Sequence, residues 1–181
     1  MSTSTEPITV RQVEALDEEA FVRHFGGVYE HSPWAARDAW RHRPFASFDG
    51  LAVAFEDAVR EAPADVRLAL VRAHPELGGR EARQGTLTDK SAAEQATAGL
   101  DRLAAEQAAR LRNVNRAYRE RFGFPLVIAV RNQEPASILA QAQARLRNSP
   151  EEELTTAIEQ IVQIARLRLR ELVVDGNTGA P

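Results

Sequence analysis

His74 is the residue of this sequence whose type and setting best suit chemistry, because an imidazole can give or take a proton near neutral pH. It is followed directly by Pro75, and a residue before proline is pushed out of the α-helical region, so the pair predicts the end of a helix. Gly78 and Gly79 then allow a tight turn or a close approach of the backbone to a ligand. His74 is therefore either a catalytic group presented on a loop or a solvated histidine where a helix stops. Spacing alone favours the solvated histidine.

Ser91, Glu94 and Gln95 form a second group of candidates, within the stretch "LTDKSAAEQ" (87–95). Ser91 followed three residues later by Glu94 fits a capping box, in which the serine oxygen accepts from a backbone amide and the glutamate reaches back to the serine N–H. The same helical turn could instead direct Glu94 and Gln95 into a pocket, where backbone N–H groups favour an anionic ligand. On the residues alone, the capping box is the preferred interpretation.

Several common kinds of catalytic site are excluded by what the sequence lacks. The chain has no cysteine, which excludes disulfides, thiolate nucleophiles and cysteine zinc sites. His24, His31 and His42 do not have the spacing of metal-binding motifs, so we predict no metal site. Neither the G-x-S-x-G motif of serine hydrolases nor a P-loop is present. Lys90, the only lysine, lies in a polar stretch that does not favour Schiff-base chemistry.

The composition and charge are those of an ordinary globular protein. Hydrophobic residues make up 44% and charged residues 27% of the 181 residues, enough apolar material for a buried core. The formal net charge of −3 is unlike that of a nucleic-acid-binding protein. No apolar run reaches the roughly 18 residues of a membrane span, and "MSTSTEP" at the start lacks the features of a signal peptide. We therefore predict a cytoplasmic protein that binds neither nucleic acid nor membrane.

Apolar residues recur at helical spacing along most of the chain, which predicts an all-α fold. Serine, aspartate and proline mark several helix starts, and glycine marks ends. The helices expected in the first half are one capped by Asp17, one capped by Ser32 with Pro33 at its first position, 48–61 and 65–73. Those expected in the second half are 91–122 ended by Gly123, one from Pro135, and one capped by Ser149 and ended by Gly176.

The stretch "FPLVIAV" (124–130) is the exception, because a short apolar run with β-branched residues is typical of a strand. No second strand is predicted for it to pair with, so we expect an extended connector buried between helices. The sequence thus predicts a single compact all-α domain of about eight helices with one extended apolar connector. We place this domain at residues 16–174, between a flexible N-terminal segment (1–15) and a flexible tail (175–181).

Five stretches follow one another in a recognisable order. They are "YEHSPWAARDAWRHRPF" (29–45), "AHPELGG" (73–79), "LTDKSAAEQATAGLDRL" (87–103), "NRAYRERFGFPLVIAVRN" (115–132) and "IARLRLRELV" (164–173). In these stretches, and in the succession HP, S-x-x-E-Q and FGFP, the chain resembles the OHCU decarboxylases (2-oxo-4-hydroxy-4-carboxy-5-ureidoimidazoline decarboxylases) of uric acid degradation. The resemblance extends over residues 16–174.

The resemblance implies a carboxy-lyase that converts OHCU into (S)-allantoin without a metal or other cofactor, on an all-helical fold that is usually a homodimer. Carried over position by position, the catalytic residues of the family match His74 and Glu94. The substrate-binding residues match Pro75, Ser91, Gln95, Ile128, Ala129 and Arg168. Arg166 remains an alternative to Arg168 at the last of these positions.

The chemistry of this reaction suits these residue types. OHCU carries a carboxylate and a hydroxyl on one ring carbon, next to a ring C=N bond that accepts the electrons left behind by CO₂. The protein must supply orientation, charge balance and one stereospecific proton.

We expect His74 to act on the hydroxyl and carboxylate end of the substrate, and Glu94 to pair with His74 or relay the proton. Gln95 and main-chain groups would bind the ureido and ring amides, and Arg168 the negative charge. The alternatives are a family member that acts on a related ureido or imidazoline substrate, and a non-catalytic all-α interaction module.

Overall fold

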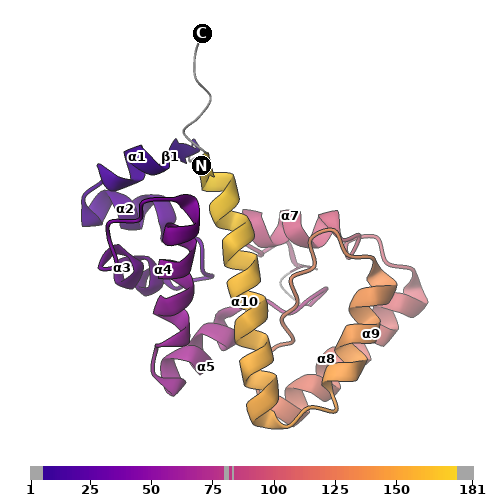
Figure 1. The fold of residues 1–181 in the computed structure, drawn as a ribbon. Coiled ribbons are helices and arrows are strands. Elements are labelled where there is room, and N and C mark those ends of the chain that lie inside the picture. Colours follow the sequence, from indigo (N-terminus) through magenta and orange to yellow (C-terminus); the bar gives the residue numbers. More distant parts are fainter. Residues whose placement is uncertain (1–5, 80–81, 83, 175–181) are drawn as a thin grey trace. The chain divides into compact units, whose positions relative to one another are not determined.

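The predicted all-α fold is confirmed by a computed structural model that describes residues 6–79, 82 and 84–174 (Figure 1). The helices in this part of the chain number nine, close to the expected eight. They are α1 (Val10–Glu14), α2 (Glu18–Phe25), α3 (Pro33–Trp40), α4 (Phe48–Arg60), α5 (Ala64–Ala73), α7 (Asp89–Thr97), α8 (Ala105–Phe122), α9 (Pro135–Arg145) and α10 (Pro150–Leu172). The strands β1 (Ile8–Thr9) and β2 (Val173–Val174) pair in parallel, with Ile8 beside Val173.

The chain divides into two compact units. The first unit consists of Met1–Leu70 and Val162–Pro181, and the second unit is Val71–Ile161. Neither boundary lies in a linker of the kind that separates independent domains, because one falls within α5 and the other within α10. The single domain at residues 16–174 stays a prediction.

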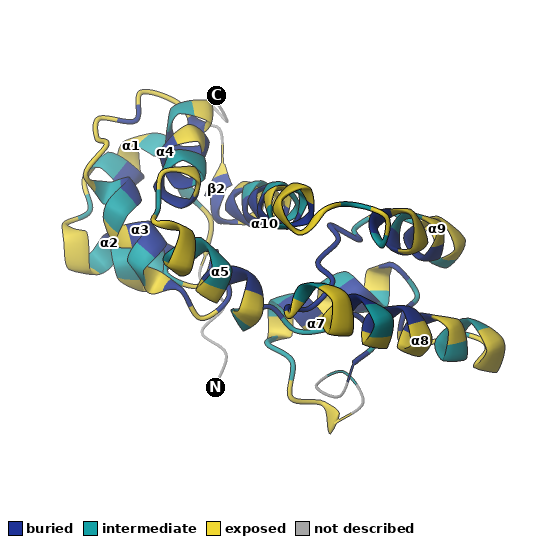
Figure 2. Cartoon of the chain, turned by 90° about the horizontal axis from the view of Figure 1, so that it is seen from below, coloured by how far each residue is buried: buried dark blue, intermediate teal, exposed yellow. Residues whose placement is uncertain are grey.

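Aromatic side chains fill the core of the first unit, where α2, α3 and α4 pack together. The rings of Phe21 and Phe25 lie 4.7 Å apart, and those of Phe21 and Phe55 lie 5.9 Å apart, within the range of favourable aromatic pairs. The Tyr29 hydroxyl donates to the Phe55 carbonyl oxygen at 3.0 Å, which satisfies the one polar atom of that buried ring. Figure 2 shows the buried faces of these helices in dark blue.

The start of the chain also contributes to the first unit. Residues 8–14, within the segment 1–15 that we expected to be flexible, form β1 and α1, and Val13 is fully buried. The Thr9 hydroxyl caps α1 by accepting from the Gln12 amide at 3.2 Å. Residues 1–5 and the expected tail 175–181 lie outside the described residues.

Three predicted helix starts agree with the structure. The Asp17 carboxylate accepts from the Ala20 amide at 2.7 Å and caps α2. Pro33 occupies the start of α3 as expected, although the side chain of Ser32 makes no capping hydrogen bond. The Ser149 hydroxyl accepts from the Glu152 amide at 3.3 Å, while the Glu152 carboxylate accepts from the Ser149 amide at 2.8 Å, which is a capping box at the start of α10.

Two predictions about the middle of the chain are wrong. The helix expected over 91–122 is two helices, α7 and α8, because Gly99 adopts a left-handed φ of +71° between them. The capping box of Ser91 and Glu94 does not form, since α7 starts earlier. Its cap is Thr88, whose hydroxyl accepts from the Ser91 amide at 3.4 Å.

The last helix, α10, ends at Leu172 and is followed directly by β2. Gly176, which we expected to end this helix, lies outside the described residues.

The connector is confirmed: residues 124–130 belong to no helix or strand, and all of them are buried. It follows α8, which ends at Gly123 with a φ of +73°, as expected of a glycine that terminates a helix. The helices α8 and α9 lie side by side in the second unit (Figure 1). In the part of the chain that the structure describes, no helix has both the length and the apolar character needed to cross a membrane.

Candidate active site

His74 lies immediately after the last residue of α5, and its amide donates to the Val71 carbonyl oxygen at 3.2 Å. Its position on a loop was therefore predicted correctly from the proline that follows. The side chain is not solvated, however, because only 7% of the residue is exposed. A titratable side chain placed inside the protein at a helix end is a better candidate for proton transfer than a solvated one.

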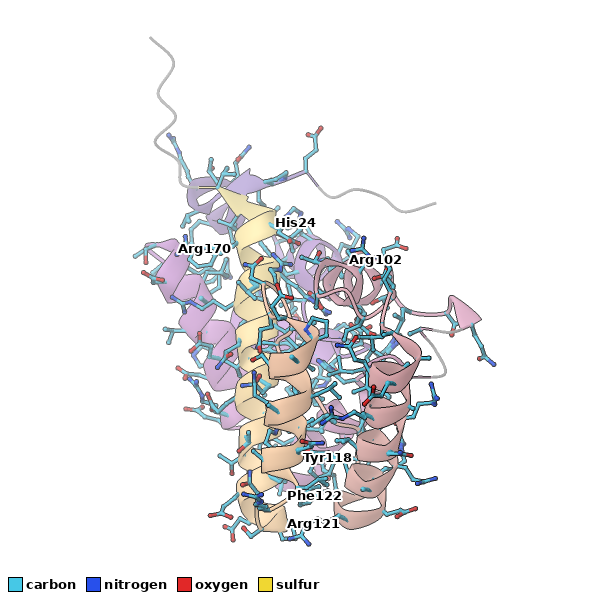
Figure 3. The ribbon with its side chains drawn as sticks, turned by 90° about the vertical axis from the view of Figure 1, so that its right-hand side faces the viewer. His24, Arg102, Tyr118, Arg121, Phe122 and Arg170 are labelled. Carbon is cyan, nitrogen blue, oxygen red and sulfur yellow. The ribbon has the colours of Figure 1, made fainter. Side chains whose placement is uncertain are left out.

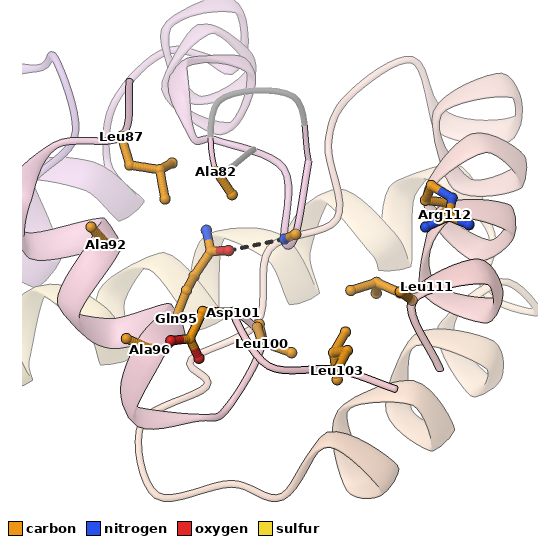
Figure 4. A pocket seen from close by; sticks show the side chains of 12 residues that line it. Ala82, Leu87, Ala92, Gln95, Ala96, Leu100, Asp101, Leu103, Leu111 and Arg112 are labelled. Atoms are coloured by element: carbon orange, nitrogen blue, oxygen red, sulfur yellow. Dashed lines mark hydrogen bonds between the residues drawn. The ribbon is translucent and has the colours of Figure 1, made fainter. Parts of the chain in front are cut away.

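Two buried amide side chains hold the loop that follows His74. The Asn115 side chain on α8 donates to the Leu77 carbonyl oxygen at 2.8 Å. The Gly78 amide donates to Oε1 of Gln95 on α7 at 2.9 Å, a bond drawn as a dashed line in Figure 4. The loop is thus fixed to two helices of the second unit, which positions the histidine before any ligand binds.

Gly78, Gly79 and Glu76 also stabilise the conformation of this loop. Gly78 has a φ of +55°, and a Cβ atom there would lie 3.0 Å from Leu111. A Cβ atom on Gly79 would lie 2.7 Å from that of Glu76, so this turn has no room for a larger residue. The Glu76 carboxylate forms an ion pair with Arg119 on α8 at 3.0 Å. The glycine pair therefore serves a tight turn, one of the two uses that the sequence suggested.

Helix α7 presents Ser91, Glu94 and Gln95 together. Residues three and four apart lie on the same face of a helix, so these side chains are neighbours. Ser91 and Gln95 are buried, with 5% and 6% exposed, and Glu94 is partly exposed. Since the capping box is absent, the structural explanation for Ser91 and Glu94 no longer holds. The side-chain oxygen Oε1 of Gln95 accepts from the Gly78 amide, so this residue links the helix with Glu94 to the loop with the histidine.

Arg131 is a site residue that the sequence did not single out. Its Nη2 atom lies 3.9 Å from Oε1 of Glu94, and the two side chains are 25% and 13% exposed. The ion pair joins α7 to the end of the connector. A signal was present, since Arg131 is the first charged residue after the apolar run, inside a stretch that carries the family resemblance.

Ile128 and Ala129, which we expected to offer main-chain groups to the substrate, are buried in the connector. The Ala129 amide donates to Oε1 of Gln160 at 3.0 Å, and its carbonyl oxygen accepts from Nε2 of Gln133 at 2.8 Å. These two main-chain groups are therefore used within the protein. A contact between Ile128 or Ala129 and the substrate stays a prediction.

A buried ion pair anchors the connector one residue earlier. Arg145 donates to the Val127 carbonyl oxygen at 2.6 Å and to the Glu153 carboxylate at 2.8 Å. The hydroxyl of Tyr118, labelled in Figure 3, donates to the same carboxylate. Burial, and next the hydrogen bond to Glu153, raise the pKa of Tyr118, so the phenol remains neutral. This cluster holds the backbone of the connector in place.

Arg168 belongs to the first unit, apart in sequence and in unit from the other predicted site residues. Its Nη1 atom forms an ion pair with Glu30 at 2.9 Å and donates to the Val28 carbonyl oxygen at 3.2 Å. Both charged side chains are almost completely buried, at 2% and 3% exposed. The alternative, Arg166, instead pairs with Asp49 at 2.5 Å and Glu56 at 2.9 Å on α4.

A cavity of about 460 Å³ lies between α7 and α8 in the second unit (Figure 4). Leucine and alanine side chains provide most of its described lining, and Gln95 is the one predicted site residue among them. His74 and Glu94 are not among these described lining residues. We therefore assign the candidate site to the group formed by the His74 loop, α7 and the connector, and not to this cavity.

This group suits proton transfer to or from an anion. Gln95 joins the loop of His74 to the helix of Glu94, and Arg131 pairs with Glu94, so an imidazole, a carboxylate and a guanidinium lie on connected segments. These are the residue types that general acid–base catalysis and anion binding require. Among residues 6–79, 82 and 84–174, no cluster of three or more His, Asp or Glu side chains is arranged to hold a metal ion. Pro75, which is half-buried, follows the histidine directly.

Known proteins of one family are similar to this chain. The family model described as OHCU decarboxylase matches residues 14–170. The 2-oxo-4-hydroxy-4-carboxy-5-ureidoimidazoline decarboxylase of Haloferax volcanii is 45% identical, over 91% of this chain and 95% of its own. The protein of the same name from Mus musculus is 38% identical, over 90% of this chain and 91% of its own.

Solved structures show the same similarity. A crystal structure of (S)-allantoin synthase superposes with a TM-score of 0.72 at 27% identity, covering 92% of this chain and 54% of that one. A crystal structure of OHCU decarboxylase in the presence of (S)-allantoin shares the fold, with a TM-score of 0.64 at 20% identity, over 87% of this chain and 98% of that one. The chain belongs to the OHCU decarboxylase family.

Proposed function

We propose that this protein is a carboxy-lyase that converts OHCU into (S)-allantoin in uric acid degradation, without a metal or other cofactor. The observation that carries the proposal is the link between the loop of His74 and the helix of Glu94 through the Gln95–Gly78 hydrogen bond. That link lies within the 157 residues, 14–170, that match the family model. The names of the relatives in Haloferax volcanii and Mus musculus support the same substrate.

The reaction needs no external electron acceptor. The bond between the ring carbon and the carboxylate breaks, CO₂ leaves, and the electron pair moves into the neighbouring ring C=N bond. His74 takes the proton of the hydroxyl on the same ring carbon as CO₂ departs. A proton is then delivered to one face of the ring, which sets the (S) configuration, and Glu94 is the group proposed to relay it.

The remaining predicted residues have binding roles. Ser91, Gln95 and Pro75 contact the substrate beside the catalytic pair, and Ile128 and Ala129 line the site along the connector. Arg168 is kept as a proposed contact of the substrate, although its guanidinium already pairs with Glu30 in the structure. We further propose that the protein is a cytoplasmic homodimer. A molar mass in solution near twice the 20.0 kDa of the chain would support the dimer.

The test of the proposed function is turnover of freshly generated OHCU, followed by circular dichroism of the (S)-allantoin formed. A positioned proton-transfer group contributes about 10²–10⁴-fold to a rate, so His74→Gln should lower kcat by about that factor while the protein remains folded. His42→Gln, at an exposed position in the first unit, is the matched control and should turn over normally. Wild-type turnover by His74→Gln would refute the role of the histidine. Absence of turnover by the wild-type protein would refute the function.

A further inference from the structure

We infer that Arg131 binds the carboxylate of the substrate that departs as CO₂, and thereby distinguishes the anionic substrate from the product. The inference rests on the proposed function and adds to it a specificity-determining residue. It starts from the ion pair of Arg131 with Glu94, in which the facing atoms lie 3.9 Å apart.

The backbone fixes the position of Arg131 from both sides. The connector before it is buried and anchored through Val127 and Ala129. Directly after it, Asn132 adopts a left-handed φ of +61°, and the Gln133 amide donates to the Val130 carbonyl oxygen at 2.9 Å, which closes a turn. The backbone that carries the guanidinium is therefore fixed before an anion binds, so no backbone entropy is lost at this position on binding.

The carboxylates of Glu94 and of the bound substrate require a cation beside them. Glu94 is a partly buried carboxylate, and a substrate that brings a second carboxylate beside it meets electrostatic repulsion, which is stronger where water is partly excluded. Arg131 compensates the first charge in the structure. At 3.9 Å the pair interacts through charge and not through a hydrogen bond between those two atoms. A guanidinium has five N–H donors and can hold two carboxylates at once.

Arg168 suits this task less well. Its guanidinium already forms a nearly fully buried ion pair with Glu30 and also binds the Val28 carbonyl oxygen. Breaking a buried ion pair leaves an uncompensated charge inside the protein, which is strongly unfavourable. Arg131 is more exposed than Arg168, lies in the unit that holds His74, and contacts a predicted catalytic residue.

The product offers the decisive comparison, because (S)-allantoin no longer carries the carboxylate. If Arg131 binds that group, its loss must weaken binding of OHCU and leave binding of (S)-allantoin almost unchanged. If Arg131 only compensates the charge of Glu94, replacing Glu94 by Gln together with Arg131→Gln must restore the KM for OHCU, whereas a direct contact with the substrate stays lost. The two roles are therefore separable by measuring both ligands on Arg131→Gln and the KM of the double variant.

The experiment compares the wild-type protein with Arg131→Gln and Arg131→Lys. A hydrogen-bonded charge pair of this kind corresponds to about a 10- to 100-fold change in binding, so Arg131→Gln should raise KM for OHCU by that factor. The Kd for (S)-allantoin, from calorimetry, should change less than about twofold. Arg131→Lys keeps the charge but loses the planar fork, and its KM should lie between the two.

Arg116→Gln is the matched control, since Arg116 is an exposed arginine of the same unit that contacts Asn113, and its KM should equal that of the wild type. An unchanged KM in Arg131→Gln, or equal weakening of OHCU and (S)-allantoin, overturns the inference and leaves the proposed function standing. Absence of wild-type turnover overturns the proposed function and the inference with it. If Arg131→Gln does not fold, the comparison is decided on Arg131→Lys, whose KM must rise without a matching rise in the Kd for (S)-allantoin.

Discussion

The backbone of Gly78 shows how closely the site depends on single residues. Its left-handed φ of +55° suits glycine, its amide donates to Gln95, and a Cβ atom would approach Leu111 to 3.0 Å. A side chain at this position would therefore strain the backbone, and it would also crowd Leu111 on α8. His74 stands four residues earlier in the same loop, so the strain would reach the imidazole.

Gly78→Ala should lower the free energy of unfolding by about 1–2 kcal/mol, the usual cost of a left-handed conformation for a residue with a Cβ atom. Turnover of OHCU should fall as well, because the loop no longer holds His74 in place. Denaturant unfolding and the (S)-allantoin assay measure the two effects. Gly27→Ala is the control, since a Cβ atom there has nothing within 4 Å. Equal behaviour of the two variants would contradict the assigned role of Gly78.

At the scale of residues, the sequence predicted what depends on residue type and near neighbours. Proline chemistry placed His74 on a loop, and the family resemblance assigned its role. The burial of His74 and the pairing of Arg131 with Glu94 were not predictable, because both depend on segments that are distant in sequence and meet only in the fold. Asn115 was missed for the same reason, since it binds Leu77 across the second unit.

The connector is the element on which the site depends most. Outside helices and strands its backbone groups need other partners, and a buried group without one is costly. Arg145 supplies a partner for Val127, and Gln160 and Gln133 supply partners for Ala129. Long polar side chains thus do here what a neighbouring strand does in a sheet.

Arg145→Met should lower the free energy of unfolding by about 3–5 kcal/mol, because it leaves the buried charge of Glu153 without its main partner. For a protein of this length the melting temperature should drop by at least about 6 °C. Arg147→Met, at an exposed position just after the same helix, should leave the melting temperature nearly unchanged. Calorimetry of the two variants tests this, and similar melting temperatures would show that the cluster does not anchor the connector.

Helix boundaries were predicted well where one cap dominates and poorly where caps compete. Asp17 and Ser149 each stand alone before an apolar pattern, and both cap a helix. Thr88 and Ser91 lie three residues apart, and Thr88 takes the capping position. The break at Gly99 was hidden because apolar residues continue through it at helical spacing, which pattern analysis cannot distinguish from one long helix.

For the molecule as a whole, the all-α class followed from periodicity, while the two units did not. The boundaries fall inside α5 and α10, where the sequence keeps its helical pattern and offers no linker. Compactness of each unit arises from contacts distant in sequence, which one sequence alone does not reveal.

The stability of the whole molecule should depend on pH through Tyr118. Its pKa is raised in the folded protein, first by burial and then by the hydrogen bond to Glu153, so the folded state favours the neutral phenol. The contribution is fully present below pH ~10, where an unfolded tyrosine is also neutral, and it is lost as the pH rises further. Between about pH 10 and 11.5, the unfolding free energy of the wild type should fall more steeply than that of Tyr118→Phe. The two slopes should differ by up to about 1.4 kcal/mol per pH unit. Parallel curves for the two proteins would contradict this.

The buried connector also bears on how the protein is inactivated by heat. After Pro125, residues 126–130 are apolar, rich in β-branched side chains and without charge or proline, which is the composition of segments that pair between chains and aggregate. While the second unit is folded, burial and the hydrogen bonds with Arg145, Gln160 and Gln133 keep this segment from contacting other molecules. Once that unit opens, the segment can associate with the same segment of other molecules, so irreversible loss of the protein on heating should follow this opening and should be faster at higher protein concentration.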